Sequence, residues 1–211
     1  MIKCIIFDCD GVLVDTEKIG NGIMLSMAAE YGFKMKLEDA YRDFNGRNLK
    51  ECFLHIENAI GKKLPDNFES EYRKKSFEAF KTQVQPMEGI ISFIEKLKIP
   101  YGVASSGPVD KIRLNLEVAG LLDKFENKIF SSYQINCWKP DPGIFLHAAK
   151  EMGFEVKDCI VIEDSKAGVK AGIQGGFKVY GFTNGYNNED LEKEGAILFD
   201  SYEQLSEMLQ L

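Results

Sequence analysis

The chain has 211 residues, of which 45% are hydrophobic and 28% are charged, and its net charge at pH 7 is −7. This length and hydrophobic content suit one domain with a sizeable core, with or without a smaller insert, and they exclude a disordered chain. The negative charge argues against nucleic acid or an anionic membrane as the main partner.

The cysteines and the apolar runs indicate where the protein works. Its five cysteines are scattered, and no two of them form a Cys-x-x-Cys pair. This usage is typical of reduced thiols in the cytoplasm rather than of a disulfide framework or a zinc site. No apolar run approaches the roughly 20 residues of a membrane span, and the first residues do not resemble a signal peptide. We therefore expect a cytoplasmic protein without membrane or nucleic-acid partners, acting as a monomer.

Six short apolar runs predict buried strands, and segments of helical periodicity separate most of them. The predicted strands are Cys4–Phe7, Tyr101–Ser105, Lys128–Phe130, Cys159–Glu163, Lys178–Phe182 and Ile197–Phe199. Apolar stripes within residues 90–97, 112–118 and 144–152 predict helices between them. This alternation predicts an α/β fold with a Rossmann-like parallel sheet, helices on both faces and right-handed crossovers.

One interval, from Thr16 to about Gln83, has no convincing strand and shows only helical stripes. The interval is far longer than the dozen or so residues that a simple crossover between parallel strands needs. We therefore predict an all-helical cap domain at residues 16–83, placed as a lid over the site. Residues 1–15 and 84–211 would then form the core domain, and an ordinary long crossover is the alternative.

The first predicted strand ends in two carboxylates, Asp8 and Asp10, followed by Gly11. Burying two carboxylates at the end of a core strand is unfavourable unless a cation meets them. Functional sites also collect outside the carboxyl ends of parallel strands. A plain Asp-Gly turn is the alternative. Because side chains alternate along a strand, we expect Cys9 to point away from both aspartates, into the fold.

Three further strand ends carry polar residues of complementary kinds. Ser105 and Ser106 precede a possible helix start, where hydroxyls and free amides can bind an anion. Lys139 lies in a loop stiffened by prolines. Glu163 and Asp164 form a second acidic pair. Each feature alone also fits an ordinary turn or helix start. Together, however, the oxygen ligands suit Mg²⁺ better than Ca²⁺, and the lysine and serines suit a phosphate dianion, which predicts a phosphoryl-transfer site.

Four motifs in this order resemble those of the haloacid dehalogenase superfamily, in its Mg²⁺-dependent phosphatase and β-phosphoglucomutase-like branch. They are Asp8-Cys9-Asp10-Gly11-Val12, Ser105 after an apolar strand, Lys139-Pro140-Asp141-Pro142, and Glu163-Asp164-Ser165-x-x-Gly168. The resemblance spans essentially the whole chain. It implies a Mg²⁺-dependent phosphatase that acts on a small phosphorylated metabolite, such as a sugar phosphate or a sugar-acid phosphate.

The resemblance also implies roles for the acidic residues. Asp8 would be the nucleophile that forms an aspartyl-phosphate. Asp10 would protonate the leaving alcohol and later activate water. Asp8, the backbone carbonyl of Asp10 and Asp164 would hold Mg²⁺, with Glu163 as an accessory ligand or a support for the others.

For the phosphate and the rest of the substrate, the resemblance implies a second group of residues. Ser105 would bind a phosphoryl oxygen with help from the Ser106 amide, and Lys139 would neutralise developing charge. Arg47 stands where the family's cap places a substrate-specificity loop, and it could pair with a carboxylate or another polar group of the substrate. An exposed arginine at a helix start is the alternative for this residue.

Several other functions remain open at this stage. Mutases of this branch carry a histidine early in the first cap helix, whereas residues 17–22 contain none, which favours hydrolysis. Relatives that cleave phosphonates use a cap lysine as a Schiff base, and Lys18 lies in a plausible region. The stretch from Val103 to Lys139 resembles bacterial sugar-acid phosphatases such as 6-phosphogluconate phosphatase. A non-catalytic binding or regulatory protein on the same fold is the alternative from another class.

Overall fold

The structure is a computed structural model, and it describes residues 2–44, 49–183, 185 and 187–211. Its main sheet has six strands in the order β5-β4-β1-β6-β7-β8, and every neighbouring pair is parallel. The strands are β1 (Cys4–Phe7), β4 (Tyr101–Ser105), β5 (Ile129–Ser131), β6 (Cys159–Glu163), β7 (Lys178–Phe182) and β8 (Ile197–Phe199). The predicted fold class is therefore confirmed, and only β5 differs from its predicted bounds, by one residue at each end.

The centre of the sheet is β1, which pairs with β4 on one side and with β6 on the other. Phe7 lies opposite Val103 in β4 and opposite Ile162 in β6. All four residues of β1 are fully buried. A strand with helices on both faces has no polar side, and this explains why the sequence here is an unbroken apolar run.

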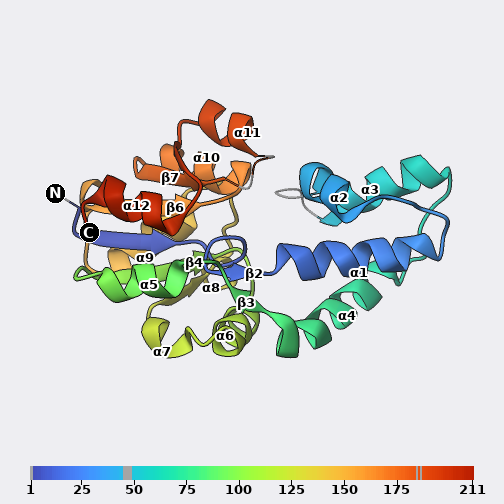
Figure 1. The fold of residues 1–211 in the computed structure, drawn as a ribbon, viewed down its shortest axis with the longest axis horizontal. Helices are drawn as coiled ribbons and strands as arrows, with labels where there is room; N and C mark the ends of the chain where they lie inside the picture. Colours follow the sequence, from blue (N-terminus) through green and yellow to red (C-terminus); the bar gives the residue numbers. More distant parts are fainter. Residues whose placement is uncertain (1, 45–48, 184, 186) are drawn as a thin grey trace.

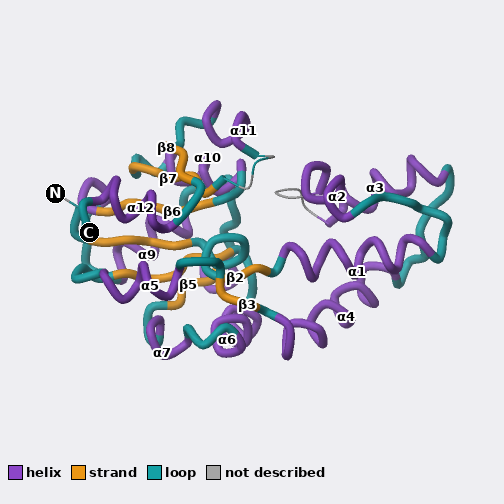
Figure 2. Tube along the Cα trace, in the orientation of Figure 1, coloured by secondary structure: helices purple, strands orange, loops and turns teal. Residues whose placement is uncertain are grey.

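Helices cover both faces of the sheet, and Figures 1 and 2 show the two layers on either side of the strands. Ile5 and Phe7 pack into one core, and Cys4 and Ile6 pack into the other, as the alternation of side chains requires. The first core is closed by α5 (Ile90–Lys96), α6 (Val109–Val118), α7 (Leu122–Phe125) and α12 (Tyr202–Leu209). The second is closed by α9 (Gly143–Glu151), α10 (Lys166–Gln174) and α11 (Asn188–Lys193).

In the sequence, a helical insert with its own hydrophobic cluster separates β1 from the other strands of the main sheet. Its helices are α1 (Glu17–Ala29), α2 (Leu37–Phe44), α3 (Leu49–Ile60) and α4 (Phe68–Gln83). Figure 1 places this insert on the side of the sheet toward which β1 runs. Helix α2, which the sequence did not predict, adds Ala40 and Phe44 to this cluster. The exact division into core and cap domains stays a prediction.

Two very short strands join the helical insert to the sheet. Before the insert lies β2 (Val14–Asp15), and after it lies β3 (Gln85–Pro86). They pair antiparallel, with Val14 opposite Pro86 and Asp15 opposite Gln85. Both connections therefore pass through one narrow ribbon, which Figure 2 shows beside the start of α1. Strands of two residues are too short to leave a periodic signal in the sequence.

Candidate active site

The predicted site residues meet at the ends of three adjacent strands. Asp8 directly follows β1, Ser105 ends β4, and Glu163 ends β6. Lys139, from the loop between α8 (Ser132–Ile135) and α9, lies among them with only 6% of its side chain exposed. Its ammonium group donates hydrogen bonds to Asp8 and, over 2.6 Å, to Oε1 of Glu163. Asp8 and Lys139, which are 131 positions apart in the sequence, thus join Glu163 in one buried charge cluster.

Glu163 is the anchor of this cluster, and both of its carboxylate oxygens are engaged. Oε1 accepts from Lys139, while Oε2 accepts from the Ser165 hydroxyl at 2.9 Å and from the backbone amides of Asp164 and Ser165 at 3.0 Å. A Cβ atom on Gly168 would lie 1.8 Å from Oε1. The glycine of the fourth motif is therefore required for Glu163 to lie where it holds Lys139.

The same place carries an excess of negative charge. Asp8, Glu163 and Asp164 offer carboxylate oxygens that all lie within 4.8 Å of one another. Only one ammonium group, that of Lys139, forms salt bridges with this group among the described residues. Burial raises the pKa of Asp8 to about 7 and, together with the charge of Glu163, raises that of Asp164 well above its ordinary value. When all three carboxyl groups are ionised, the single ammonium leaves two negative charges uncompensated, and oxygen ligands of this kind fit a divalent cation.

Gly11 makes room for Asp164 beside the first motif. Its φ angle is +80°, in the left-handed region that favours glycine, and a Cβ atom there would lie 2.1 Å from Oδ2 of Asp164. Backbone hydrogen bonds from Gly11 to Val14 and from Leu13 to Cys9 close the turn. Cys9 itself is fully buried in the core, so the prediction that it points away from the aspartates is confirmed.

Asp10 lies in a different network from Asp8. Its carboxylate accepts hydrogen bonds from the Thr16 hydroxyl at 2.7 Å, the Lys111 ammonium at 2.8 Å and the Asn115 amide at 3.2 Å. Burial alone would raise the pKa of Asp10, but the charge and hydrogen bond of Lys111 outweigh it, and the pKa lies below its ordinary value. Asp10 is therefore held as a carboxylate with its own cation.

The sequence reasoning missed Lys111 and Asn115. Both belong to α6, the helix that follows the Ser105 motif, and they lie one turn apart on the same helix face. This spacing is the signal that could have found them, although polar residues at such positions usually face solvent. Asn115 is fully buried, which the sequence pattern did not indicate.

Ser105 lies where a phosphate-binding hydroxyl was predicted, next to the acidic cluster. It is 2% exposed, and its oxygen accepts a hydrogen bond from the Gly107 amide at 3.1 Å. In the neighbouring strand, the Ser131 hydroxyl donates to the Gly107 carbonyl at 2.6 Å and so fixes the same turn. Ser106 is half-buried in this turn. The predicted role of Arg47 falls on a residue that lies outside the described part of the chain.

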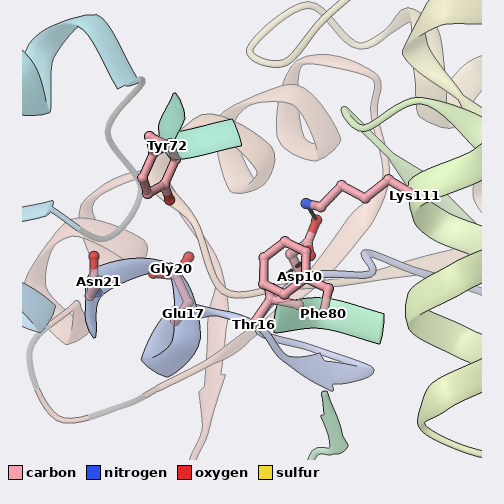
Figure 3. A pocket seen from close by; sticks show the side chains of 8 residues that line it. All are labelled: Asp10, Thr16, Glu17, Gly20, Asn21, Tyr72, Phe80 and Lys111. Carbon is pink, nitrogen blue, oxygen red and sulfur yellow. Dashed lines mark hydrogen bonds and ion pairs between the residues drawn. The ribbon is translucent and has the colours of Figure 1, made fainter. Parts of the chain in front are cut away.

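A pocket of about 210 Å³ lies between Asp10 and the helical insert (Figure 3). Lys111 reaches into it from the core toward Asp10, and α1 and α4 form the opposite side. Its lining residues are Asp10, Thr16, Glu17, Gly20, Asn21, Tyr72, Phe80 and Lys111. Lys18, in contrast, is exposed and lines another hollow with Ile19 and Gly22. The part of α1 where mutases carry a histidine thus contributes Glu17, Gly20 and Asn21 here.

Glu17 also lines a second hollow, of about 180 Å³, with Asp15, Tyr41 and Asp164 among its other residues. Its side chain therefore lies between the pocket beside Asp10 and the hollow beside Asp164. Burial, and then the charge of Asp10, raise the pKa of Glu17 to about 7. Within the described part of the chain, its carboxyl group has no hydrogen-bond or salt-bridge partner.

A Rossmann-like sheet, a helical insert after its first strand and a buried lysine–carboxylate cluster together define an enzyme of the α/β class. The sequence model of the haloacid dehalogenase-like hydrolases matches residues 5–182. The chain therefore belongs to the haloacid dehalogenase-like hydrolase family, as its motifs predicted.

Individual relatives agree with this assignment. The 6-phosphogluconate phosphatase of Escherichia coli is 32% identical over 208 residues, which cover 98% of this chain and 94% of the relative. A phosphorylated carbohydrates phosphatase of Thermotoga maritima is 27% identical, with 99% of both chains covered. A crystal structure of a haloacid dehalogenase-like protein of unknown function from Agrobacterium tumefaciens superposes with a TM-score of 0.94 at 26% identity, covering 100% of this chain and 98% of that one. The prediction of a phosphatase of this family is confirmed.

Proposed function

We propose that this protein is a Mg²⁺-dependent phosphatase that hydrolyses a small sugar phosphate or sugar-acid phosphate through an aspartyl-phosphate. The observation that carries the proposal is the different setting of two aspartates in one turn. Asp8 lies in the buried acidic cluster with Lys139, and Asp10 faces the pocket with Lys111. One setting suits a nucleophile beside a cation, and the other suits a group that exchanges protons with the substrate. The names of both phosphatase relatives support a phosphorylated sugar as substrate.

In the first step, a carboxylate oxygen of Asp8 attacks the phosphorus atom and the bond from phosphorus to the ester oxygen breaks. Asp10 gives a proton to that oxygen, so that the leaving group departs as an alcohol. Asp10 must first bind this proton, and the ion pair with Lys111 opposes protonation. We therefore expect Lys111 to separate from Asp10 before or during this step.

In the second step, water attacks the phosphorus atom of the aspartyl-phosphate and the bond from phosphorus to the Asp8 oxygen breaks. Asp10 takes the proton from this water, inorganic phosphate is released, and Asp8 is restored. The arrangement described above, with Asp10 ionised beside Lys111, is the form that this step requires.

The charge of the transferring group is matched by the residues around Asp8. Lys139 would neutralise a phosphoryl oxygen, and Ser105 and the Ser106 amide would hold the others. Asp8, Asp164 and the backbone carbonyl of Asp10 would hold Mg²⁺, which when bound supplies positive charge to the phosphoryl oxygens and to Asp8. Because both oxygens of Glu163 are engaged, its proposed contribution is to hold Lys139 rather than to bind the ion.

The helical insert would act as a cap that excludes water while the aspartyl-phosphate forms and that selects the leaving group. Arg47 would contribute to this selection from the insert. We further propose that the protein works in the cytoplasm as a monomer. The five free cysteines support the reducing compartment. No described helix has the length and apolar character of a membrane span.

The test is the release of inorganic phosphate from a panel of sugar phosphates, sugar-acid phosphates and p-nitrophenyl phosphate, with Mg²⁺ or with EDTA. The proposal predicts hydrolysis that requires the metal, with one phosphorylated sugar or sugar acid clearly preferred. Isomerisation of a hexose phosphate without phosphate release would instead identify a mutase. Failure of every ester to react would identify a binding protein on this fold.

A further inference from the structure

The pocket beside Asp10 is where the leaving alcohol must begin. If Asp10 exchanges a proton with the ester oxygen, the first carbon atoms of the alcohol lie on the side of Asp10 that faces this pocket. Figure 3 shows Asp10 and Lys111 on the core side, and Glu17, Asn21 and Tyr72 on the side of the helical insert. The residues on the insert side therefore determine what stands next to the ester oxygen.

Charge in this pocket is distributed unevenly. Lys111 is the one cation among its lining residues, and it is committed to Asp10 at 2.8 Å. Glu17 is the other carboxyl group of the lining, and it has no hydrogen-bond or salt-bridge partner in the described part of the chain. A half-buried carboxyl group without a partner is unfavourable unless a ligand satisfies it. A hydroxyl group can do so by donating a hydrogen bond, whereas a carboxylate would add a third negative group.

We propose that Glu17 accepts a hydrogen bond from the hydroxyl group next to the ester bond of the substrate, so that the site takes phosphate esters of polyols. An ester with a carboxylate at that position would be disfavoured, because its carboxylate would face the ionised carboxylate of Glu17, which has no ion-pair partner among the described residues. This inference rests on the proposed phosphatase function and names the chemistry of its leaving group. It concerns only the first carbons of the alcohol. A sugar acid with its carboxylate at the far end of the chain satisfies it as well as a sugar does.

Three two-carbon esters test this directly, because they differ only at the position that Glu17 would contact. At that position 2-hydroxyethyl phosphate carries a hydroxyl group and phosphoglycolate carries a carboxylate. Ethyl phosphate carries no polar group there. At a pH well above 7, where Glu17 is ionised, we expect kcat/KM for 2-hydroxyethyl phosphate to exceed that for ethyl phosphate by about tenfold or more, and that for phosphoglycolate by a larger factor.

Two variants of Glu17 separate the hydrogen bond from the charge. Glu17→Gln keeps an acceptor oxygen but removes the charge, so the discrimination against phosphoglycolate should fall by about tenfold while the preference for the hydroxyl group is largely kept. Glu17→Ala removes both, so the hydroxyl ester should lose its advantage over ethyl phosphate. Glu30→Gln, an exposed carboxyl group that follows the last residue of the same helix, serves as the matched control and should leave all three ratios unchanged.

Failure of this inference can be told from failure of the proposed function. If p-nitrophenyl phosphate and all three alkyl esters release no phosphate with Mg²⁺, the phosphatase proposal itself is wrong. If p-nitrophenyl phosphate is hydrolysed but phosphoglycolate reacts as well as 2-hydroxyethyl phosphate, or none of the three alkyl esters reacts, the role of Glu17 is wrong. Equal loss on all three esters in both folded variants would also overturn it.

Discussion

The surroundings of Asp8 and those of Asp10 differ in charge balance, although the two residues lie in one turn. Near Asp8, three carboxylates share the ammonium group of Lys139. Near Asp10, one carboxylate meets Lys111 and two neutral donors. Burial raises the pKa of Asp8 to about 7, whereas Lys111 outweighs burial and lowers the pKa of Asp10. The first motif therefore holds two different carboxylates. Asp8 needs an added cation, whereas Asp10 is already paired with Lys111.

This difference shows how two aspartates in one turn can be suited to two different roles. A carboxyl group acquires its role from its surroundings, because burial, neighbouring charges and hydrogen bonds act on its pKa separately. Asp8 depends on groups from β6 and the Lys139 loop, and Asp10 depends on groups from α6 and Thr16. Changes on one side should therefore leave the other side largely intact.

The largest expected effect is the loss of turnover on replacing Asp8. We expect Asp8→Asn to reduce phosphate release by at least about a thousandfold, because an amide is a poor nucleophile. The measurement is steady-state release of phosphate with Mg²⁺, with a circular dichroism spectrum to check the fold. Asp123→Asn, at an exposed position in α7, is the matched control. Turnover retained in Asp8→Asn would remove this residue as the nucleophile.

A second effect, on the order of a few kcal/mol, concerns stability without metal. In EDTA, the free energy of unfolding of the wild type should fall relative to that of Asp8→Asn as the pH rises from about 4 to about 7. The pKa of Asp8 is about 7 in the folded protein against 3.8 ordinarily, so the folded state binds the extra proton in this window. This stabilising contribution is present below pH 3.8 and is lost as the pH rises through 7.

Urea unfolding at a series of pH values measures this difference. The pKa of Asp164 is raised as well, in part by the charge of Asp8, so the difference between the two proteins includes the effect of Asp8 on Asp164. Parallel pH profiles for the two proteins would contradict the uncompensated charge that we infer around Asp8.

Addition of Mg²⁺ also tests the charge balance around Asp8, because the ion would supply the positive charge that the acidic cluster lacks. At a concentration one hundred times its Kd, the ion should raise the free energy of unfolding by about 2.7 kcal/mol, because it binds only the folded state. Asp164→Asn should lose most of this gain, since it removes one of the three clustered carboxylates. Lys111→Met, on the Asp10 side, should keep it. An equal loss in both variants would show that the two sides are not independent.

The smallest expected effect is on the Asp10 side. Lys111→Met should lower the free energy of unfolding by about 1 to 2 kcal/mol, because it leaves Asp10 without its cation at a place where both side chains are only about a quarter exposed, 28% and 26%. The pKa of Asp10 lies below 3.8 and that of Lys111 above 10.5. Their contribution is therefore full between these pH values, and it is lost as the pH falls through the first folded pKa or rises through the second.

Unfolding of Lys111→Met at pH 7 and near pH 2 checks this window, since the difference from the wild type should shrink in acid. Lys124→Met, which removes a surface ion pair with a separation of 3.9 Å, is the control and should cost much less. A pH-independent difference would mean that Lys111 stabilises the fold by packing rather than by its charge.

Much of this arrangement could be predicted from the sequence because the sheet is buried on both faces. Runs such as Cys4–Phe7 have no polar position, so their ends are sharp, and polar residues at those ends meet at one edge of the sheet. Asp8 and Glu163 were predicted for this reason, and Lys139 was predicted from its proline-flanked loop and from the family motif. The structure brings all three together.

The parts that could not be predicted lie where the sequence pattern is weak or ambiguous. Lys111 and Asn115 occupy polar positions of an amphipathic helix, where most residues face solvent, and only the tertiary fold turns them toward Asp10. Glu17 begins a helix, and an acidic residue there is explained by the helix dipole alone. Helix α2 and the pair β2–β3 are too short for their periodicity to be distinguished from that of a loop.

The ribbon of β2 and β3 makes the helical insert a removable module. Because Asp15 and Gln85 lie opposite each other in an antiparallel pair, the backbone leaves the sheet and returns to it at the same point. A two-residue Asn-Gly turn has the geometry to join such a pair, so the whole insert could be exchanged for a different one, or for a hairpin, without changing the order of the six parallel strands. If the insert selects the alcohol, as we propose, the chemistry at the strand ends and the choice of alcohol are encoded in separable stretches of the chain, which recombination could alter independently.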